Sequence, residues 1–407
     1  MLETVREYAL DLLEESGEAA ELRARHAAYY VALAEEAEPK LTGPEQAVWL
    51  DGLEREHNNL RAALRRSRDG GEVEVGLRLA AALWRFWWRR GHLSEGRGWL
   101  EGLLAVVSPD DRGVDRATHA RALNGAGALA YVQDDHNRAT PLLAHSLSLY
   151  RETGDEQSSA MVLNNLGNIA MDQGDYERAA KLFEESVTLK RTLKDTWGIA
   201  TSLANLGQVA ENQGAYQRAM TLFEESLALS RTLGDTYGVA ASLQSMGNVA
   251  LQQGDAERAL ALERESLALW EELDDKHWTA KALKGLGDVA RSRGDPAQAL
   301  ALYKDSLTLL QRIGDRQAMA ECVEGVAGVA ATRARPMRAA RLFGAAARLR
   351  EAIGAPLSPG KRIAYDHDVA ALAMTLGEVT LAAIWAEGRT ISLDEAIVET
   401  LSFDGIT

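Results

Sequence analysis

A forty-residue pattern repeats six times without a gap through the middle of this 407-residue chain. The copies begin at Leu123, Leu163, Leu203, Leu243, Leu283 and Val323. A unit of this size cannot bury its apolar residues alone, so units with a strict period stack on their neighbours in an array. The repeat therefore predicts a solenoid whose core runs through every copy.

Three positions of the pattern hold small residues in nearly every copy. Alanine fills one position throughout, at Ala139, Ala179, Ala219, Ala259, Ala299 and Ala339. Glycine fills a second in five copies, at Gly127, Gly167, Gly207, Gly247 and Gly287, and serine a third, at Ser146, Ser186, Ser226, Ser266 and Ser306. Because small side chains let two helices approach closely, we expect Gly167 and Ala179 to mark a helix crossing.

Each copy predicts a hairpin of two antiparallel helices. The second copy has apolar residues at helical spacing, namely Met161, Leu163, Leu166, Ile169 and Ala170. Gly174-Asp175 then interrupts the pattern, since glycine supplies the left-handed conformation that ends a helix and aspartate caps the next one. A second apolar stripe follows and predicts the returning helix.

One position of the second helix is aromatic in most copies, with Phe183, Phe223, Tyr303 and Phe343. We expect these rings to fill the space beside the helix crossing. The fourth copy has Glu263 there instead. An unpaired buried charge is too costly, so either that helix is rotated locally or the carboxylate has a partner.

The chain resembles the tetratricopeptide repeat family through the pattern Leu163-x-x-Leu166-Gly167-x-x-Ala170, then Gly174-x-Tyr176, Ala179, Phe183 and Ser186. Its forty-residue spacing is similar to the long-helix variant of kinesin-light-chain-like proteins. The resemblance covers residues 117–356. It implies an all-α fold, a right-handed solenoid or superhelix of antiparallel helix hairpins with helical caps at both ends.

The flanking residues 1–116 and 357–407 do not follow the period but are predicted to be helical. Residues 75–107 look like a degenerate repeat that is rich in aromatic residues, with Trp84, Phe86, Trp87, Trp88 and Trp99. This hairpin is either a hydrophobic cap that closes the solenoid or an aromatic docking patch. We expect residues 357–407 to cover the last apolar face of the array.

Several flanking segments are similar to bacterial signal-transduction ATPases, including LuxR-type transcriptional regulators with a DNA-binding module at one end and repeats at the other. The similar segments are residues 2–9, 26–30, 56–64, 385–389 and 393–397. The resemblance implies that the chain corresponds to the C-terminal sensor half of such a regulator, without its nucleotide-binding half. It also implies an ATPase domain as a neighbour and partner.

The composition excludes several classes of partner and location. A net charge of −15 argues against direct binding of nucleic acid or of an anionic membrane. The single cysteine, Cys322, rules out an internal disulfide and fits a reducing compartment. No apolar run approaches the ~18 residues of a membrane span, and the first residues lack an apolar signal core. We therefore expect a soluble, cytoplasmic protein.

The sequence offers no convincing catalytic, cofactor or metal motif. The nearest approach to a phosphate-binding loop, residues 354–362, has the wrong spacing around Gly360-Lys361. Consecutive residues of a helix point in different directions, so Asp366-His367-Asp368 fits a solvated turn better than a metal site. We expect no enzyme activity, no cofactor and no metal.

The inner, concave face of the solenoid is the best candidate for a binding site, because the first helices line it and carry many amides. Each Asn or Gln side chain can both donate and accept hydrogen bonds along an extended peptide. Lys281, Lys284 and Arg291 are suited to holding a carboxylate. The predicted partner-binding residues are Arg121, Asn124, Tyr131, Asn164, Asn165, Asn168, Met171, Asp172, Asn205, Gln208, Glu211, Asn212, Gln244, Asn248, Gln252, Lys281, Lys284, Asp288 and Arg291.

Together these features predict a non-enzymatic domain that binds a protein or peptide in its groove. Partner binding is expected to change the curvature of the stack and so to release or restrain a neighbouring ATPase. Three alternatives stay open: the polar residues only solvate the groove, the Trp-rich hairpin senses a small-molecule effector, or the chain is a standalone assembly scaffold.

Overall fold

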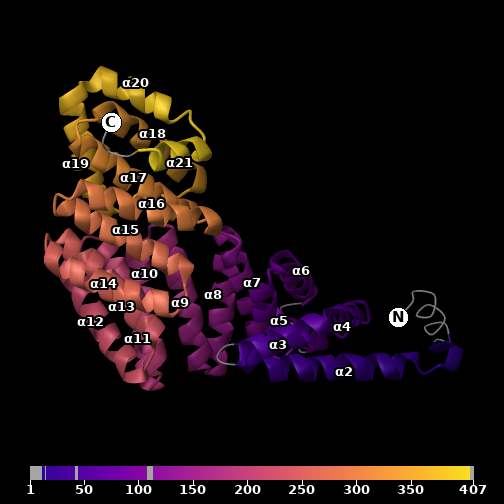
Figure 1. The fold of residues 1–407 in the computed structure, drawn as a ribbon. Coiled ribbons are helices and arrows are strands. Elements are labelled where there is room, and N and C mark those ends of the chain that lie inside the picture. The colour runs from indigo at the N-terminus through magenta and orange to yellow at the C-terminus, as the bar shows by residue number, and fades with distance from the viewer. Residues whose placement is uncertain (1–11, 14, 42–44, 108–112, 404–407) are drawn as a thin grey trace. The chain divides into compact units, whose positions relative to one another are not determined.

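The computed structural model describes residues 12–13, 15–41, 45–107 and 113–403, and every regular element in these ranges is a helix (Figure 1). The chain divides into two compact units, unit 1 (Met1–Asp172) and unit 2 (Gln173–Thr407). Residues 2–9, which carry part of the regulator resemblance, lie outside the described ranges. None of the described helices combines the length and apolarity that crossing a membrane requires.

Unit 1 contains the first part of the fold. Its elements are α2 (Ala19–Ala37), η1 (Glu38–Leu41), α3 (Gln46–Arg55), α4 (His57–Asp69), α5 (Val73–Arg90), α6 (Leu93–Leu104), α7 (Arg116–Val132), α8 (His136–Thr153) and α9 (Glu156–Asp172). The helices α7 and α8 pack against each other as the first predicted hairpin, and α5 packs on α6 as the Trp-rich one.

Most aromatic residues of the α5–α6 hairpin belong to the core of unit 1. Phe86 and Trp87 are fully buried, and Trp84 is nearly so. A Cβ on Gly96 would lie 2.5 Å from the Trp87 ring, so α5 and α6 meet closely there. Trp88 is partly exposed and stacks on Trp84. These contacts favour the cap interpretation over the docking patch.

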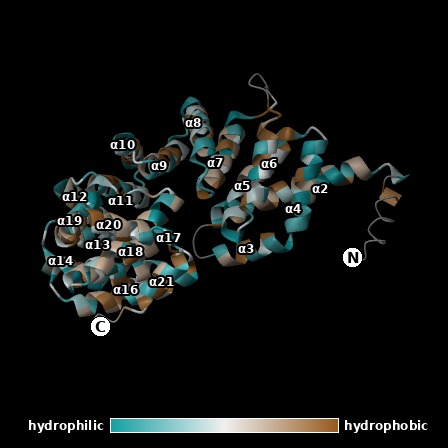
Figure 2. Ribbon diagram, turned by 90° about the horizontal axis from the view of Figure 1, so that it is seen from above, coloured by the Kyte–Doolittle hydropathy of each residue, from teal (hydrophilic) through white to brown (hydrophobic). Residues whose placement is uncertain are grey.

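Unit 2 contains the later repeats and the C-terminal helices. Its elements are α10 (Tyr176–Thr192), α11 (Thr196–Asn212), α12 (Tyr216–Leu233), α13 (Thr236–Gln252), α14 (Ala256–Glu272), α15 (Lys276–Ser292), α16 (Pro296–Ile313), α17 (Arg316–Thr332), α18 (Pro336–Ile353), α19 (Pro359–Leu376), α20 (Glu378–Gly388) and α21 (Leu393–Leu401). Hydrophobic and hydrophilic residues alternate within single helices, as Figure 2 shows for α16, because each helix buries one stripe.

The turns between helices follow the predicted glycine and aspartate pattern. The carboxylate of Asp235 accepts from the backbone N–H of Gly238 at 3.0 Å and caps α13. Gly234 before it has φ 67°, a left-handed conformation that suits glycine. Lys194 and Asp274 occupy equivalent turns with φ 57° and 51°, so the period keeps its turn geometry even without glycine.

The predicted pair Gly167 and Ala179 is divided between the two units, but the equivalent crossing one copy later lies within unit 2 and shows the expected packing. A Cβ on Gly207 would lie 2.6 Å from the Phe223 ring, and Ala219 is completely buried beside it. The serine position of the pattern also links the two helices of a hairpin. The hydroxyl of Ser226 donates to the backbone carbonyl of Ala200, in the first helix of the same hairpin, at 2.9 Å.

The C-terminal helices do more than cover the last repeat. Both α20 and α21 pack on α18, as a cap should. The helix α19, however, also contacts α11 and α17. The hydroxyl of Tyr216 donates to the carbonyl of Gly360 at 3.4 Å, and a Cβ on Gly360 would lie 2.7 Å from the Glu211 carbonyl oxygen. The start of α19 therefore returns to the inner helix of a repeat three copies earlier.

Candidate functional site

A cavity of about 990 Å³ lies within unit 2, bordered by α11, α13, α15 and α17 and by the start of α19. The inner helices bring together ten of the residues predicted from the sequence. These are Gln208, Glu211, Asn212, Gln244, Asn248, Gln252, Lys281, Lys284, Asp288 and Arg291. The cavity is thus the part of the predicted groove that the structure assembles most completely.

The other predicted groove residues lie elsewhere. Asn205 belongs to unit 2 but is not part of the cavity lining. Eight residues lie on α7 and α9 of unit 1: Arg121, Asn124, Tyr131, Asn164, Asn165, Asn168, Met171 and Asp172. Contacts inside unit 1 hold several of them, since Arg121 pairs with Glu38 and the Tyr131 hydroxyl donates to Asp172 at 2.9 Å. Their role in binding stays a prediction.

Charged side chains of α15 and α17 form a connected network on the cavity wall. The ammonium of Lys284 lies 2.8 Å from an Asp288 oxygen and 3.4 Å from a Glu321 oxygen. Burial alone would lower the pKa of Lys284, but the two carboxylates raise it well above its usual value. The hydroxyl of Tyr303 donates to Asp288 at 2.6 Å. Lys284 is therefore charged and engaged inside the protein.

Two ion pairs attach α19 to this wall. Arg291 Nη1 donates to Asp368 Oδ2 at 2.8 Å, and Lys361 Nζ donates to Glu321 Oε1 at 2.8 Å. Burial favours the neutral form of Glu321, yet Lys361 and Lys284 lower the pKa of this carboxyl well below its usual range. The cations that the sequence assigned to a ligand carboxylate thus have carboxylate partners within the chain. An acidic ligand must compete with these partners.

The other cavity wall, formed by α11 and α13, carries amide side chains in place of most of the charges. Gln244 is buried and accepts from the indole N–H of Trp270 at 3.1 Å, so it supports the wall. Gln208 donates to Glu211 at 2.9 Å. Burial raises the pKa of Glu211, and Lys361 only partly offsets this. Asn248 is half-buried and borders the cavity.

Glu263 lies in the core of the fourth repeat, next to the cavity wall. Its side chain is 1% exposed, and it occupies the space that Cβ atoms on Gly247 and Gly285 would need. Among the described residues, neither carboxyl oxygen has a hydrogen-bond partner. Ala259 and Ser266 of α14 stay buried at their pattern positions. Burial raises the pKa of Glu263 well above its usual value, with Lys284 opposing the shift. Burial therefore favours the neutral form of this carboxyl.

Several cavity residues were not predicted from the sequence, and they fall into two groups. Glu321 and Glu324 lie 40 residues after Lys281 and Lys284, so the period itself pointed to them. Lys361 and Asp368 lie on α19, outside the period, and no spacing rule placed them at the inner face. The long-range return of α19 supplied the missing part of the site.

The comparisons with known proteins agree with this architecture. A family model described as "Tetratricopeptide repeat" matches residues 118–192, 158–232, 198–272 and 238–312. Residues 118–312 are therefore tetratricopeptide repeats, and the fold is an all-α solenoid of the class that the pattern predicted.

Several solved structures share the fold. A Rap protein complexed with Competence and Sporulation Factor gives a TM-score of 0.63 at 12% identity, over 91% of this chain and 99% of that one. The apo form of RapI gives 0.60 at 16% identity, over 69% and 99%. Aspartyl phosphate phosphatase F from Bacillus subtilis gives 0.58 at 13% identity, over 77% and 83%. At these identities the likeness concerns the fold alone.

The sequence relatives carry the names of transcriptional regulators. Provisionally named HTH-type transcriptional regulators of Mycobacterium bovis and Mycobacterium tuberculosis are 37% identical to this chain over 159 residues. The match covers 38% of this chain and 18% of each regulator. This chain therefore corresponds to only a small part of those proteins.

Proposed function

We propose that the chain is a regulatory, non-enzymatic interaction domain whose unit 2 cavity binds a peptide or an extended segment of a partner protein. The observation that carries the proposal is the cavity of about 990 Å³, bordered by amides on one wall and ion pairs on the other. Pockets for drug-sized ligands have volumes of ~300–1,000 Å³, so the cavity has room for a few residues of a peptide.

The amide wall is suited to a peptide backbone. Gln208 and Asn248 occupy equivalent positions of successive repeats, as do Asn212 and Gln252. An extended peptide presents N–H and C=O groups at regular steps, and each amide can satisfy either. The periodic placement thus matches a repetitive ligand better than a compact one.

The ion pairs between α19 and the inner helices link ligand binding to the position of α19. A ligand carboxylate that reaches Arg291 must displace Asp368, and one that reaches Lys361 must displace Glu321. Either exchange weakens the attachment of α19 to the inner helices. Binding is therefore coupled to the position of α19, which gives the ligand a structural consequence.

The relatives support a regulatory setting. One Rap protein was solved with Competence and Sporulation Factor, and another Rap regulator with the Phr* peptide. The mycobacterial relatives are transcriptional regulators by name. We extend the proposal accordingly: the chain acts as the sensor part of a bacterial signal-transduction regulator and controls a neighbouring ATPase domain. The acidic net charge speaks against direct nucleic-acid binding.

Panning a random peptide library against the purified chain tests the proposal. Peptides that bind the wild-type chain should lose about 5- to 100-fold in affinity for a Gln208→Ala/Asn248→Ala variant, because each lost hydrogen bond is worth about 0.5–1.5 kcal/mol. Glu271→Ala, on the exposed surface of α14, is the matched control and should bind normally. Equal affinity for all three proteins would place the site outside the cavity.

A further inference from the structure

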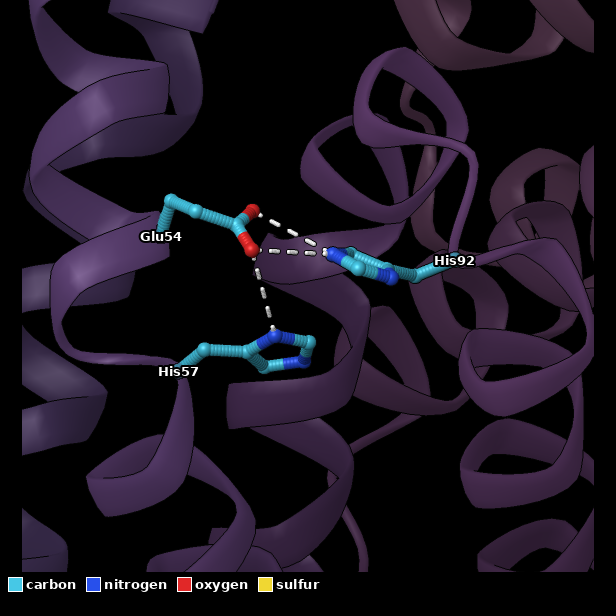
Figure 3. A group of neighbouring side chains, drawn as sticks. All are labelled: Glu54, His57 and His92. Atoms are coloured by element: carbon cyan, nitrogen blue, oxygen red, sulfur yellow. Dashed lines mark hydrogen bonds and ion pairs between the residues drawn. The ribbon is translucent and has the colours of Figure 1, made fainter.

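Unit 1 brings one carboxylate and two imidazoles together in a part of the chain that lies before the repeats. Glu54 lies near the end of α3, His57 begins α4, and His92 precedes α6. Figure 3 shows the three side chains converging from these elements. The group lies in unit 1 and is independent of the proposed cavity in unit 2.

The distances among the three side chains are close to those of a metal-ligand set. The Nε2 atom of His92 lies 3.2 Å from both Glu54 carboxylate oxygens, and Nδ1 of His57 lies 3.8 Å from Oε1 of Glu54. One ligand atom from each residue fits within a mutual distance of 4.8 Å. Zn²⁺ with bonds of ~2.0–2.1 Å places tetrahedral ligand atoms about 3.3 Å apart, so the widest separation must contract by up to about 1.5 Å.

A second carboxylate, that of Glu95, lies next to the ring nitrogen of His57 that does not face Glu54. Oε1 of Glu95 lies 3.3 Å from Nε2 of His57, and Arg61 binds Glu95 through two nitrogens. His57 is buried, with 7% exposed. Its Nε2 makes the ion-pair contact with Glu95 but no hydrogen bond among the described residues, because the angles of that contact are not those of a hydrogen bond. A metal-bound histidine usually directs its other nitrogen at a carboxylate, which fixes the tautomer and the ring orientation. Glu95 is placed for this role.

We propose that Glu54, His57 and His92 bind one Zn²⁺ ion, with Glu95 orienting His57 from behind. Two histidines and one carboxylate form a ligand set that zinc uses with a water as fourth ligand. The ion would join α3, α4 and the α5–α6 turn, which are separate segments of the chain. The prediction of no metal rested on Asp366-His367-Asp368 and did not consider this group, in which His92 follows Glu54-x-x-His57 by 35 residues.

Competition with a chromophoric chelator, using the untagged full chain and zinc chloride, tests the proposal. We expect one high-affinity zinc ion per chain. Glu95→Gln should weaken zinc binding about 10- to 100-fold, as loss of a supporting partner does, and His92→Ala should weaken it further. His367→Ala removes an exposed histidine of α19 and should leave the affinity unchanged.

Cobalt provides a second measurement that reports on geometry. Co²⁺ bound to the wild-type chain should show the visible absorption bands of a tetrahedral site, and Glu54→Gln should abolish them. If His92→Ala does not fold, the partly exposed Glu54 still gives a variant that tests the site. Absence of stoichiometric zinc binding would overturn the proposal, as would equal zinc affinity in Glu54→Gln, His92→Ala and His367→Ala.

Discussion

The fourth repeat (α13 and α14) and the fifth (α15 and α16) share one sequence pattern, but different side chains fill the equivalent space between their helices. Tyr303 of the fifth repeat and Glu263 of the fourth both lie against two glycines, one from their own hairpin and one from the next. The Tyr303 hydroxyl donates to Asp288, whereas the Glu263 carboxyl has no hydrogen-bond partner in the described part of the chain. The pattern thus determines where the side chain packs, and side-chain length determines whether its polar end is satisfied.

The inner faces of the two repeats also differ, in the charge of their side chains. Gln244 and Asn248 of the fourth repeat correspond to Lys284 and Asp288 of the fifth, exactly one period later. The amides give a neutral wall, whereas the charges give a network that the chain itself completes through Glu321. Two repeats with the same backbone can therefore present very different surfaces to a ligand.

The largest expected effect comes from removing the central cation of the fifth repeat. Lys284→Met leaves Asp288 and Glu321 without their shared partner, and breaking a buried ion pair from one side costs about 3–5 kcal/mol. Because Lys284 is partly accessible, we expect a loss near 3 kcal/mol in the free energy of unfolding by urea at pH 7. Gln244→Met, the equivalent change in the fourth repeat, should cost about 1 kcal/mol. Equal losses would show that the charged network adds nothing.

Replacing the unpartnered acid should stabilise the fourth repeat. Glu263→Phe restores the residue type of the neighbouring copies and removes a buried polar group without a partner. We expect a gain of about 1–3 kcal/mol in the free energy of unfolding, measured in urea. Glu263→Tyr is a sharper variant, since its hydroxyl should reach Asn248 as Tyr303 reaches Asp288. A loss of stability in both variants would mean that the carboxyl has a favourable role.

The pH dependence of stability should differ between Glu263 and a neutral side chain. Burial raises the pKa of Glu263, so the folded chain keeps this proton at pH values where the unfolded chain, with a pKa near 4.5, has lost it. The contribution of Glu263 to stability must then fall as pH rises, by up to about 1.4 kcal/mol per pH unit between the two pKa values. Relative to Glu263→Gln, the wild-type chain should be less stable at pH 8 than at pH 5. A constant difference would show that Glu263 is ionised in the fold.

The smallest effect concerns the turns that end the two repeats. Asp274 has φ 51°, whereas Gly314 occupies the equivalent turn of the fifth repeat. A left-handed conformation costs a residue with a Cβ ~1–2 kcal/mol, although aspartate tolerates it better than most residues. We expect Asp274→Gly to raise the free energy of unfolding by about 1 kcal/mol at most. A decrease would mean that the Asp274–Lys276 ion pair outweighs the strain.

The sequence predicted the features that depend on periodicity. Gly207, Ala219 and Phe223 recur at fixed spacing, so their shared crossing followed from the pattern and the structure confirms it. The route of α19 could not be predicted, because the contact between Gly360 and Glu211 joins residues that share no period. The protonation of Glu263 depends on three-dimensional burial, which composition does not reveal. The period therefore predicted the inner-helix residues of the candidate site, whereas the residues of α19 could be placed only by the structure.

Hydrogen exchange with and without a peptide selected on the wild-type chain tests the central claim most directly. If the cavity binds the peptide, exchange should slow in α13 and α15 and change in α19, while the outer helices α12, α14 and α16 keep their rates. Protection confined to those outer helices or to α5 and α6 would contradict the account.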